Sequence, residues 1–145
     1  MGARHSGREA ALQMLFQMEG SAATAAQASA LYWRNFDEAE PAGRAYADDA
    51  VVGVETNLAT IDEQIRKAST HWRLERMARV DRNVIRLAAW ELAHRPDVPV
   101  AVILDEAVEL AKAYGTEDSG SFVNGVLAQI AAALGRKDEP VKPAS

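Results

Sequence analysis

The sequence predicts an all-α protein of about seven helices. Apolar side chains recur at helical spacing through most of the chain, and no stretch shows convincing alternation of period two. Alanine is frequent, whereas only 9 glycines and 5 prolines occur among 145 residues, which favours helix. The hydrophobic fraction of 48% is enough for a real core, and the length suits one compact domain or two tightly packed helical subdomains.

Capping signals indicate where the first two helices begin. Ser6 and Glu9 have the spacing of a capping box, in which a hydroxyl and a carboxylate three residues on bond each other's backbone amides. The first helix is expected to begin there and to end near Gly20, a residue type common at helix C-termini. Thr24 and Gln27 repeat the spacing and open a second helix.

The second helix is expected to stop before Pro41, because a residue that precedes proline disfavours the helical conformation. A third helix covers about residues 42–58. Thr60 and Glu63 show the capping-box spacing once more and open a short fourth helix. The segment 72–80 that follows is basic and only weakly periodic.

Three further helices are expected in the C-terminal half. The helix over about 81–94 is apolar almost all round, which indicates a central, buried helix. The next helix covers 99–114 and is cleanly amphipathic. The last helix begins at Asp118 or Ser119 and ends at Gly135.

Five positions are not explained by the apolar stripes alone. Glu91 falls inside the apolar arc of the central helix, so we expect a structural hydrogen bond or ion pair for its carboxylate. Phe16 and Phe122 lie at stripe edges, where a ring either packs into the core or forms a surface platform. Gly125, in mid-helix, predicts the close approach of another backbone or a ligand. Asp118 either caps its helix or lies where exposed amides meet a phosphate.

The sequence carries no pattern for catalysis or metal binding. Cysteine is absent, which excludes thiolate sites and fits a reducing cytoplasm. Glu91 and His94 supply only one of the two Glu-x-x-His pairs that a di-iron bundle needs. Phosphate-binding loops, the dinucleotide fingerprint and the nucleophile elbow are missing as well. We therefore expect no enzyme activity, no cofactor and no metal.

The formal net charge of −5 limits the kinds of partner. A protein that binds nucleic acid through a broad electrostatic surface is usually basic, so any RNA site here must be local and shared with a basic partner. No apolar run approaches the ~20 residues that span a bilayer, and no apolar segment follows the basic N-terminus as in a signal peptide. We expect no membrane association.

Five separated motifs, in order and plausibly spaced, resemble the NusB family of transcription antitermination factors. They begin at Arg8 (REAALQMLFQ), Val80 (VDRNVIRLAAWEL), Asp97 (DVP), Asp105 (DEAVELAK) and Gly115 (GTEDS, with FVNGVL from Phe122). The likeness spans about Arg4 to Leu134, and the C-terminal block is its most specific part.

The resemblance implies a fold of two perpendicular three-helix bundles, or a three-plus-four variant. We expect one domain over residues 1–135, with an N-terminal bundle of about 6–70 and a C-terminal bundle of about 71–135. Residues 136–145 hold two prolines and several charges and are expected to form a disordered tail.

The resemblance further implies a cytoplasmic protein that binds the boxA element of ribosomal-RNA leader transcripts. It implies a heterodimer with ribosomal protein S10 (NusE) within an RNA polymerase antitermination complex. Asp81 resembles a family position at the S10 interface. The positions carried over as RNA contacts are Arg4, Arg8, Phe16, Asp118 and Phe122.

The basic N-terminal arm is shorter here than in many family members, with only Arg4, His5 and Arg8. We therefore expect weak binding of single-stranded boxA RNA by the chain alone and clearly tighter binding with S10. Two alternatives stay open. One is a NusB-like domain of the kind fused to RNA methyltransferases, which the absence of a Rossmann half disfavours. The other is a helical scaffold or homodimer without direct RNA binding.

Overall fold

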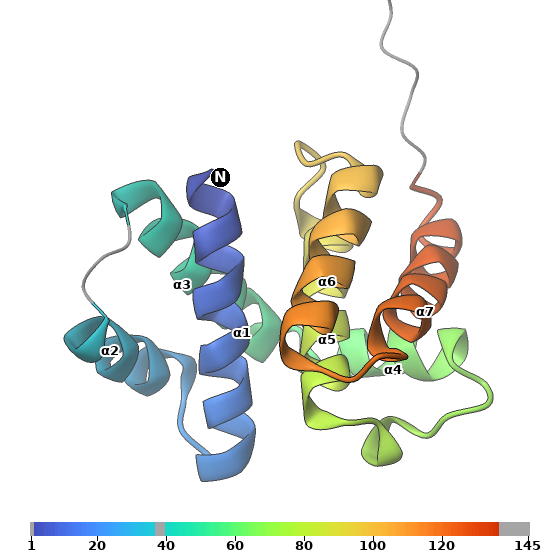
Figure 1. Cartoon of the computed structure of the whole chain (residues 1–145), viewed down its shortest axis with the longest axis horizontal. Coiled ribbons are helices and arrows are strands. Elements are labelled where there is room, and N and C mark those ends of the chain that lie inside the picture. The colour runs from blue at the N-terminus through green and yellow to red at the C-terminus, as the bar shows by residue number, and fades with distance from the viewer. Residues whose placement is uncertain (1, 37–39, 137–145) are drawn as a thin grey trace, which may run out of the picture.

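The computed structural model describes residues 2–36 and 40–136 and confirms the all-α class. Seven α-helices occur in this part of the chain, and a single 3₁₀ turn, η1, covers Leu74–Arg76. The helices form two packed groups that lie side by side (Figure 1). None of the described helices is long and apolar enough to cross a membrane.

The first group consists of α1 (Ala3–Ser21), α2 (Ala25–Asn35) and α3 (Pro41–Thr56). Two glycines let α1 and α3 pack closely. A Cβ atom on Gly7 would lie 2.7 Å from the carbonyl oxygen of Gly43, and one on Gly43 would lie 2.8 Å from that of Ala3. Because any larger residue would push the helices apart, these glycines fix the spacing within the group.

The second group consists of α4 (Leu58–Ala68), α5 (Arg79–His94), α6 (Val100–Tyr114) and α7 (Ser119–Ala133). Helix α5 lies at its centre, packs on α6 and α7, and also contacts α1 and α3 of the first group. Its expected burial is confirmed, since most of its side chains are inaccessible to solvent. The core therefore runs through both groups, with α5 as the shared element.

One of the three expected capping boxes forms. At the start of α2 the Gln27 amide donates to the Thr24 hydroxyl, and the Thr24 amide donates to the Gln27 side chain. The box expected at Ser6 is wrong, because α1 already begins at Ala3 and Ser6 lies within it. The box expected at Thr60 is wrong for the same reason, since α4 begins at Leu58. An N-cap residue has extended backbone, which a residue inside a helix cannot adopt.

The packing of α4 bears on the division between the two bundles. Helix α4 packs on α5 and α7 and only slightly on α3. We therefore propose that the boundary between the two bundles lies ahead of α4, at about residue 57 instead of about residue 70. This division corresponds to the three-plus-four arrangement. Of the expected tail, residues 137–145 lie outside the described residues. Arg136, its first residue, donates to the backbone oxygens of Leu92, Arg95 and Val98.

Candidate nucleic-acid and partner interface

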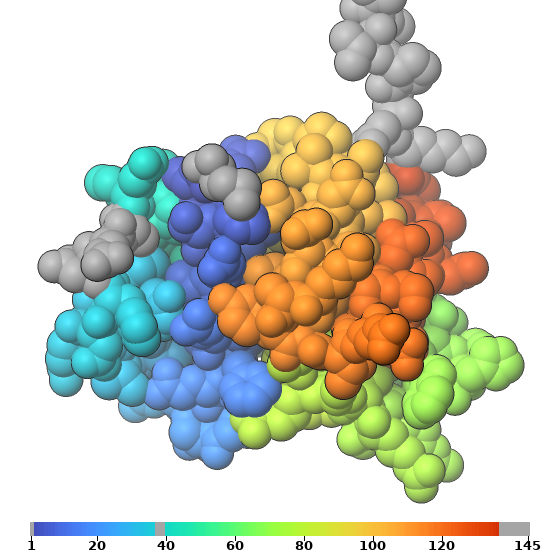
Figure 2. Space-filling model, in the orientation of Figure 1, coloured from blue at the N-terminus to red at the C-terminus, as the bar shows by residue number. Residues whose placement is uncertain are grey.

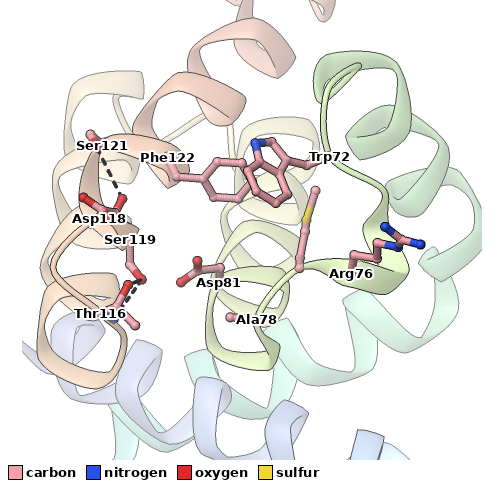
Figure 3. Close-up of a pocket in the computed structure, with 10 residues that line it drawn as sticks. Trp72, Arg76, Ala78, Asp81, Thr116, Asp118, Ser119, Ser121 and Phe122 are labelled. Carbon is pink, nitrogen blue, oxygen red and sulfur yellow. Dashed lines mark hydrogen bonds between the residues drawn. The ribbon is translucent and has the colours of Figure 1, made fainter.

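Three of the predicted site residues, Asp81, Asp118 and Phe122, line one open groove of about 470 Å³ between the start of α5 and the start of α7 (Figure 3). The segment before α5 adds Trp72 and Arg76 to the lining, and further residues around the start of α7 complete it. Residues about forty positions apart in sequence therefore share one surface. This juxtaposition makes the groove the leading candidate site.

Asp81 is the acidic residue at the base of this groove. It lies in the first turn of α5, is only 9% exposed, and its Oδ1 atom has no hydrogen-bond partner among the described residues. Leaving a buried carboxylate oxygen unbonded is costly. The groove therefore presents an acceptor suited to a donor from a bound molecule.

The start of α7 forms the opposite wall. Ser119 is buried, and its hydroxyl accepts a hydrogen bond of 2.9 Å from the Thr116 amide. Gly115 permits this turn, because a Cβ atom there would lie 2.5 Å from the Ser119 hydroxyl oxygen. Asp118 precedes the helix but makes no side-chain cap bond, so the simple capping role considered for it is not observed and its carboxylate is exposed.

Two aromatic rings form the apolar end of the groove. Phe122 is half-buried against the core, while Trp72 is 58% exposed. Their ring centroids are 6.3 Å apart and the ring planes are nearly perpendicular. The basic character of this segment is evident from the sequence, but Trp72 was not among the predicted site residues. A tryptophan beside arginines in a weakly periodic segment was the available signal.

Phe16 lies near the C-terminal end of α1 and is not part of the groove lining. Its ring is 37% exposed, and the guanidinium of Arg79 lies 4.1 Å from the ring centroid. Arg79 also donates to the backbone oxygen of Phe16 over 2.9 Å. The ring is thus a partly exposed platform with a cation over one face.

Arg8 is buried and faces the core. Its guanidinium donates to both carboxylate oxygens of Glu91 at 2.9–3.0 Å, and the Tyr46 hydroxyl donates to the same carboxylate over 2.8 Å. Burial and the adjacent Glu91 charge raise the pKa of Tyr46 well above its ordinary value, so the hydroxyl stays protonated. The structural partner expected for Glu91 is confirmed. The burial of Arg8 argues against the RNA contact expected for it, because a phosphate would have to displace this ion pair.

Arg4 is exposed at the opposite end of α1 from Phe16, twelve residues away, or about 18 Å along the helix at 1.5 Å per residue. It pairs with the equally exposed Asp97 at 3.0 Å. The structure therefore does not bring Arg4 into the groove.

Gly125 does not behave as expected within the chain. A Cβ atom built on it would meet nothing within 4 Å, so the expected close approach of another backbone of this chain is wrong. The residue instead borders a shallow depression beside Trp72 and Phe122. In the described residues, no group of three or more His, Asp or Glu side chains is arranged to hold a metal ion.

Comparison with known proteins gives a consistent result. The sequence profile of the NusB family matches residues 5–132. The transcription antitermination protein NusB of Sorangium cellulosum is 67% identical over 138 residues, which covers 95% of this chain and 98% of that protein. The protein of the same name from Myxococcus xanthus is 46% identical over 94% of this chain and 99% of its own length.

Solved structures share the fold. A structure of NusB from T. maritima superposes with a TM-score of 0.81 and 38% identity, covering 89% of this chain and 90% of that one. A structure described as antitermination factors NusB and NusE in complex with dsRNA gives a TM-score of 0.84 and 26% identity, covering 92% and 98%.

Proposed function

The chain belongs to the NusB family of transcription antitermination proteins, a non-enzymatic family, and we propose that it binds boxA RNA together with ribosomal protein S10 (NusE). In this proposal the heterodimer acts on ribosomal-RNA leader transcripts within an RNA polymerase antitermination complex in the cytoplasm. The solved structure of a relative with NusE and RNA supports the choice of partners.

The observation that carries the proposal is the groove at Asp81. It combines a buried, unbonded carboxylate oxygen with two accessible aromatic rings, Trp72 and Phe122. An amide or a cationic side chain of a protein partner satisfies such an oxygen. We therefore assign Asp81 to the S10 interface.

The RNA contacts are proposed only on residues that are at least partly exposed. Phe16 and Phe122 offer faces or edges on which unstacked bases pack, and Arg4 supplies a cation at the N-terminal end. Asp118 cannot bind a phosphate, but its carboxylate accepts hydrogen bonds from base amino groups. Arg8 is removed from this set, since its role here is to hold Glu91.

The test is an RNA-binding titration with and without S10. Labelled single-stranded boxA RNA is titrated with the full chain, either alone or in an equimolar mixture with S10. Each titration is repeated at several salt concentrations between about 50 and 200 mM. With three or four phosphate contacts, the log–log salt slope for the chain alone should be about −2 to −3. We expect clearly tighter binding with S10, and equal affinity with and without it contradicts the proposal.

Asp81→Asn gives the matched variant, with Asp49→Asn, an exposed carboxylate on α3, as its control. We expect Asp81→Asn to weaken S10 binding and to lose the gain in RNA affinity that S10 provides. Asp49→Asn should behave like the parent. A stable homodimer that neither S10 nor RNA dissociates, seen by sedimentation velocity, favours the scaffold alternative.

A further inference from the structure

The segment between α4 and α5 displays an unusual set of side chains. Trp72, Arg73, Arg76 and Arg79 are all exposed within eight residues. The backbone that carries them is held in place, because Leu74 and Met77 are buried and Arg82 donates to both of their carbonyl oxygens at 3.1 and 3.0 Å. The exposed side chains therefore project from a fixed turn.

Two nearby arginines are neutralised by carboxylates, whereas Arg73 and Arg76 pair with no carboxylate of the described residues. Arg82 and Arg86 pair with Glu19, and Arg86 also forms a two-bond contact with Asp62. By contrast, among the described residues the side chains of Arg73 and Arg76 form no hydrogen bond or ion pair. Arg79 reaches Glu19 only at 3.6 Å and is 43% exposed. Local positive charge is thus available on an otherwise acidic protein.

These side chains connect the two aromatic platforms. At one end, Trp72 and Arg76 line the same groove as Phe122. At the other end, Arg79 lies over Phe16. Figure 2 shows the end of α1 (blue), the segment before α5 (yellow-green) and the start of α7 (orange) meeting on one face of the molecule.

Gly20 fits this arrangement. A Cβ atom on it would lie 2.7 Å from an Nη atom of Arg79, so the guanidinium crosses α1 where a side chain is missing. The same guanidinium donates to the Phe16 carbonyl over 2.9 Å. A helix-terminal glycine therefore positions a cation on an aromatic ring.

We infer that Phe122, Trp72, Arg76, Arg79 and Phe16 form one continuous track for single-stranded RNA, in which Trp72, Arg76 and Arg79 are binding residues. The inference rests on the proposed function and extends it to the segment 72–79. Trp72 offers a ring on which a base stacks, and the arginines offer phosphate contacts. The track bridges the two helix bundles.

The chemistry of the groove favours RNA over an acidic peptide. The carboxylate of Asp118, at the start of α7, stands across the groove from Arg76 (Figure 3). It repels the carboxylates of a peptide that would pair with the arginines. A polynucleotide, in contrast, presents phosphates to one wall and base amino groups to the other. The track also supplies phosphate contacts that the short N-terminal arm lacks.

The test compares four variants of the full chain in the titration described above, with and without S10, beside a control variant for net charge and Phe122→Ala as a reference for the RNA site proposed above. Arg76→Gln and Arg79→Gln should each weaken RNA binding several-fold and make the salt slope shallower by about 0.7, the value per phosphate contact on a single strand. Trp72→Ala should weaken binding roughly tenfold with an unchanged slope, because stacking releases no counterions. Arg34→Gln on α2, an exposed arginine outside the groove lining, controls for net charge.

The fourth variant, Gly20→Ala, probes the position of Arg79. The added methyl group displaces only the tip of a flexible side chain, so the fold should be kept, as a melting curve checks. Gly20→Ala should weaken RNA binding in the parent but have no further effect in the Arg79→Gln background. A double-mutant cycle measures this coupling, which a purely structural role of Arg79 does not produce.

The outcomes separate the inference from the function beneath it. If Trp72→Ala, Arg76→Gln and Arg79→Gln bind RNA like the parent while Phe122→Ala does not, the track is wrong and the proposed function stands. If Arg34→Gln loses as much RNA affinity as Arg76→Gln does, net charge explains the effect and the inference fails. If the variants lose S10 binding but keep RNA binding, the segment is a protein interface and the inference also fails. If the parent binds no RNA even with S10, the proposed function and the track fall together.

Discussion

At the scale of single residues, burial divides the sites that the sequence suggested. Arg8 and Arg4 lie on the same helix four residues apart, and the family resemblance implied an RNA contact for both. The structure buries Arg8 against Glu91 and leaves Arg4 in solvent beside Asp97. Arg8 therefore contributes to the stability of the fold, whereas Arg4 remains accessible to a binding partner.

We expect the Arg8–Glu91 pair to govern stability. Arg8→Ala leaves a buried carboxylate without its cation and should lower the free energy of unfolding by about 3–5 kcal/mol. Arg4→Ala, which removes an exposed pair, should change it by less than about 1 kcal/mol. Urea denaturation of both variants measures the difference. Equal effects would show that Arg8 is not an internal anchor.

Glu91 and Trp72 show which kinds of residue role can be predicted from the sequence and which cannot. Glu91 was predicted correctly, because a carboxylate inside an apolar arc demands a partner. Its partner was not predictable, because Arg8 is 83 positions away. Trp72 was missed, because exposure in a weakly periodic segment is decided by how that segment packs.

At the scale of elements, the helices obey their local signals except at two N-termini. The Thr24 box forms, whereas α1 and α4 begin ahead of the boxes expected at Ser6 and Thr60. A capping motif is compatible with a helix N-terminus at that position. It does not prevent the residues before it from joining the helix when tertiary contacts favour this. Residues 3–5 gain such contacts through Arg4 and His5.

Two helical glycines predict opposite effects of the same substitution. Gly125→Ala in α7 adds a methyl group to open space and should raise the free energy of unfolding by up to about 1 kcal/mol, the helix-propensity difference. Gly53→Ala in α3 places the methyl group on the Trp90 indole and should lower it by about 1–3 kcal/mol. Thermal denaturation of the pair tests the packing of α3 on α5. Stabilisation by both substitutions contradicts it.

At the scale of the whole molecule, polar contacts join the two bundles beside the shared helix α5. His5 of α1 lies between two carboxylates, with Nδ1 2.7 Å from Glu106 of α6 and Nε2 2.9 Å from Glu9. The hydrogen bond to Glu106 in particular raises the pKa of His5 above its ordinary value of 6.5. The protonated ring thus holds α1 to α6.

This pair predicts a direction for the dependence of stability on pH. Because the folded pKa of His5 exceeds the unfolded one, its contribution is fully present below about pH 6.5 and is lost as the pH rises through the raised folded value. Urea denaturation of the parent and of His5→Gln at several pH values between about 6 and 9 measures the contribution of His5 to the free energy of unfolding. The difference between the two proteins should shrink with rising pH, and a difference that grows contradicts the assignment.

The sequence by itself determined the helical class, most helix boundaries and the family, because these depend on spacings within about ten residues and on motifs that read in order. Only the tertiary structure decided which charged residues are buried and which segments share a surface. Arg8 meets Glu91, Arg79 meets Phe16, and Trp72 meets Phe122 across dozens of residues. The physical reason is that such contacts arise from packing whole helices around α5, and no local pattern encodes the face that each distant partner presents.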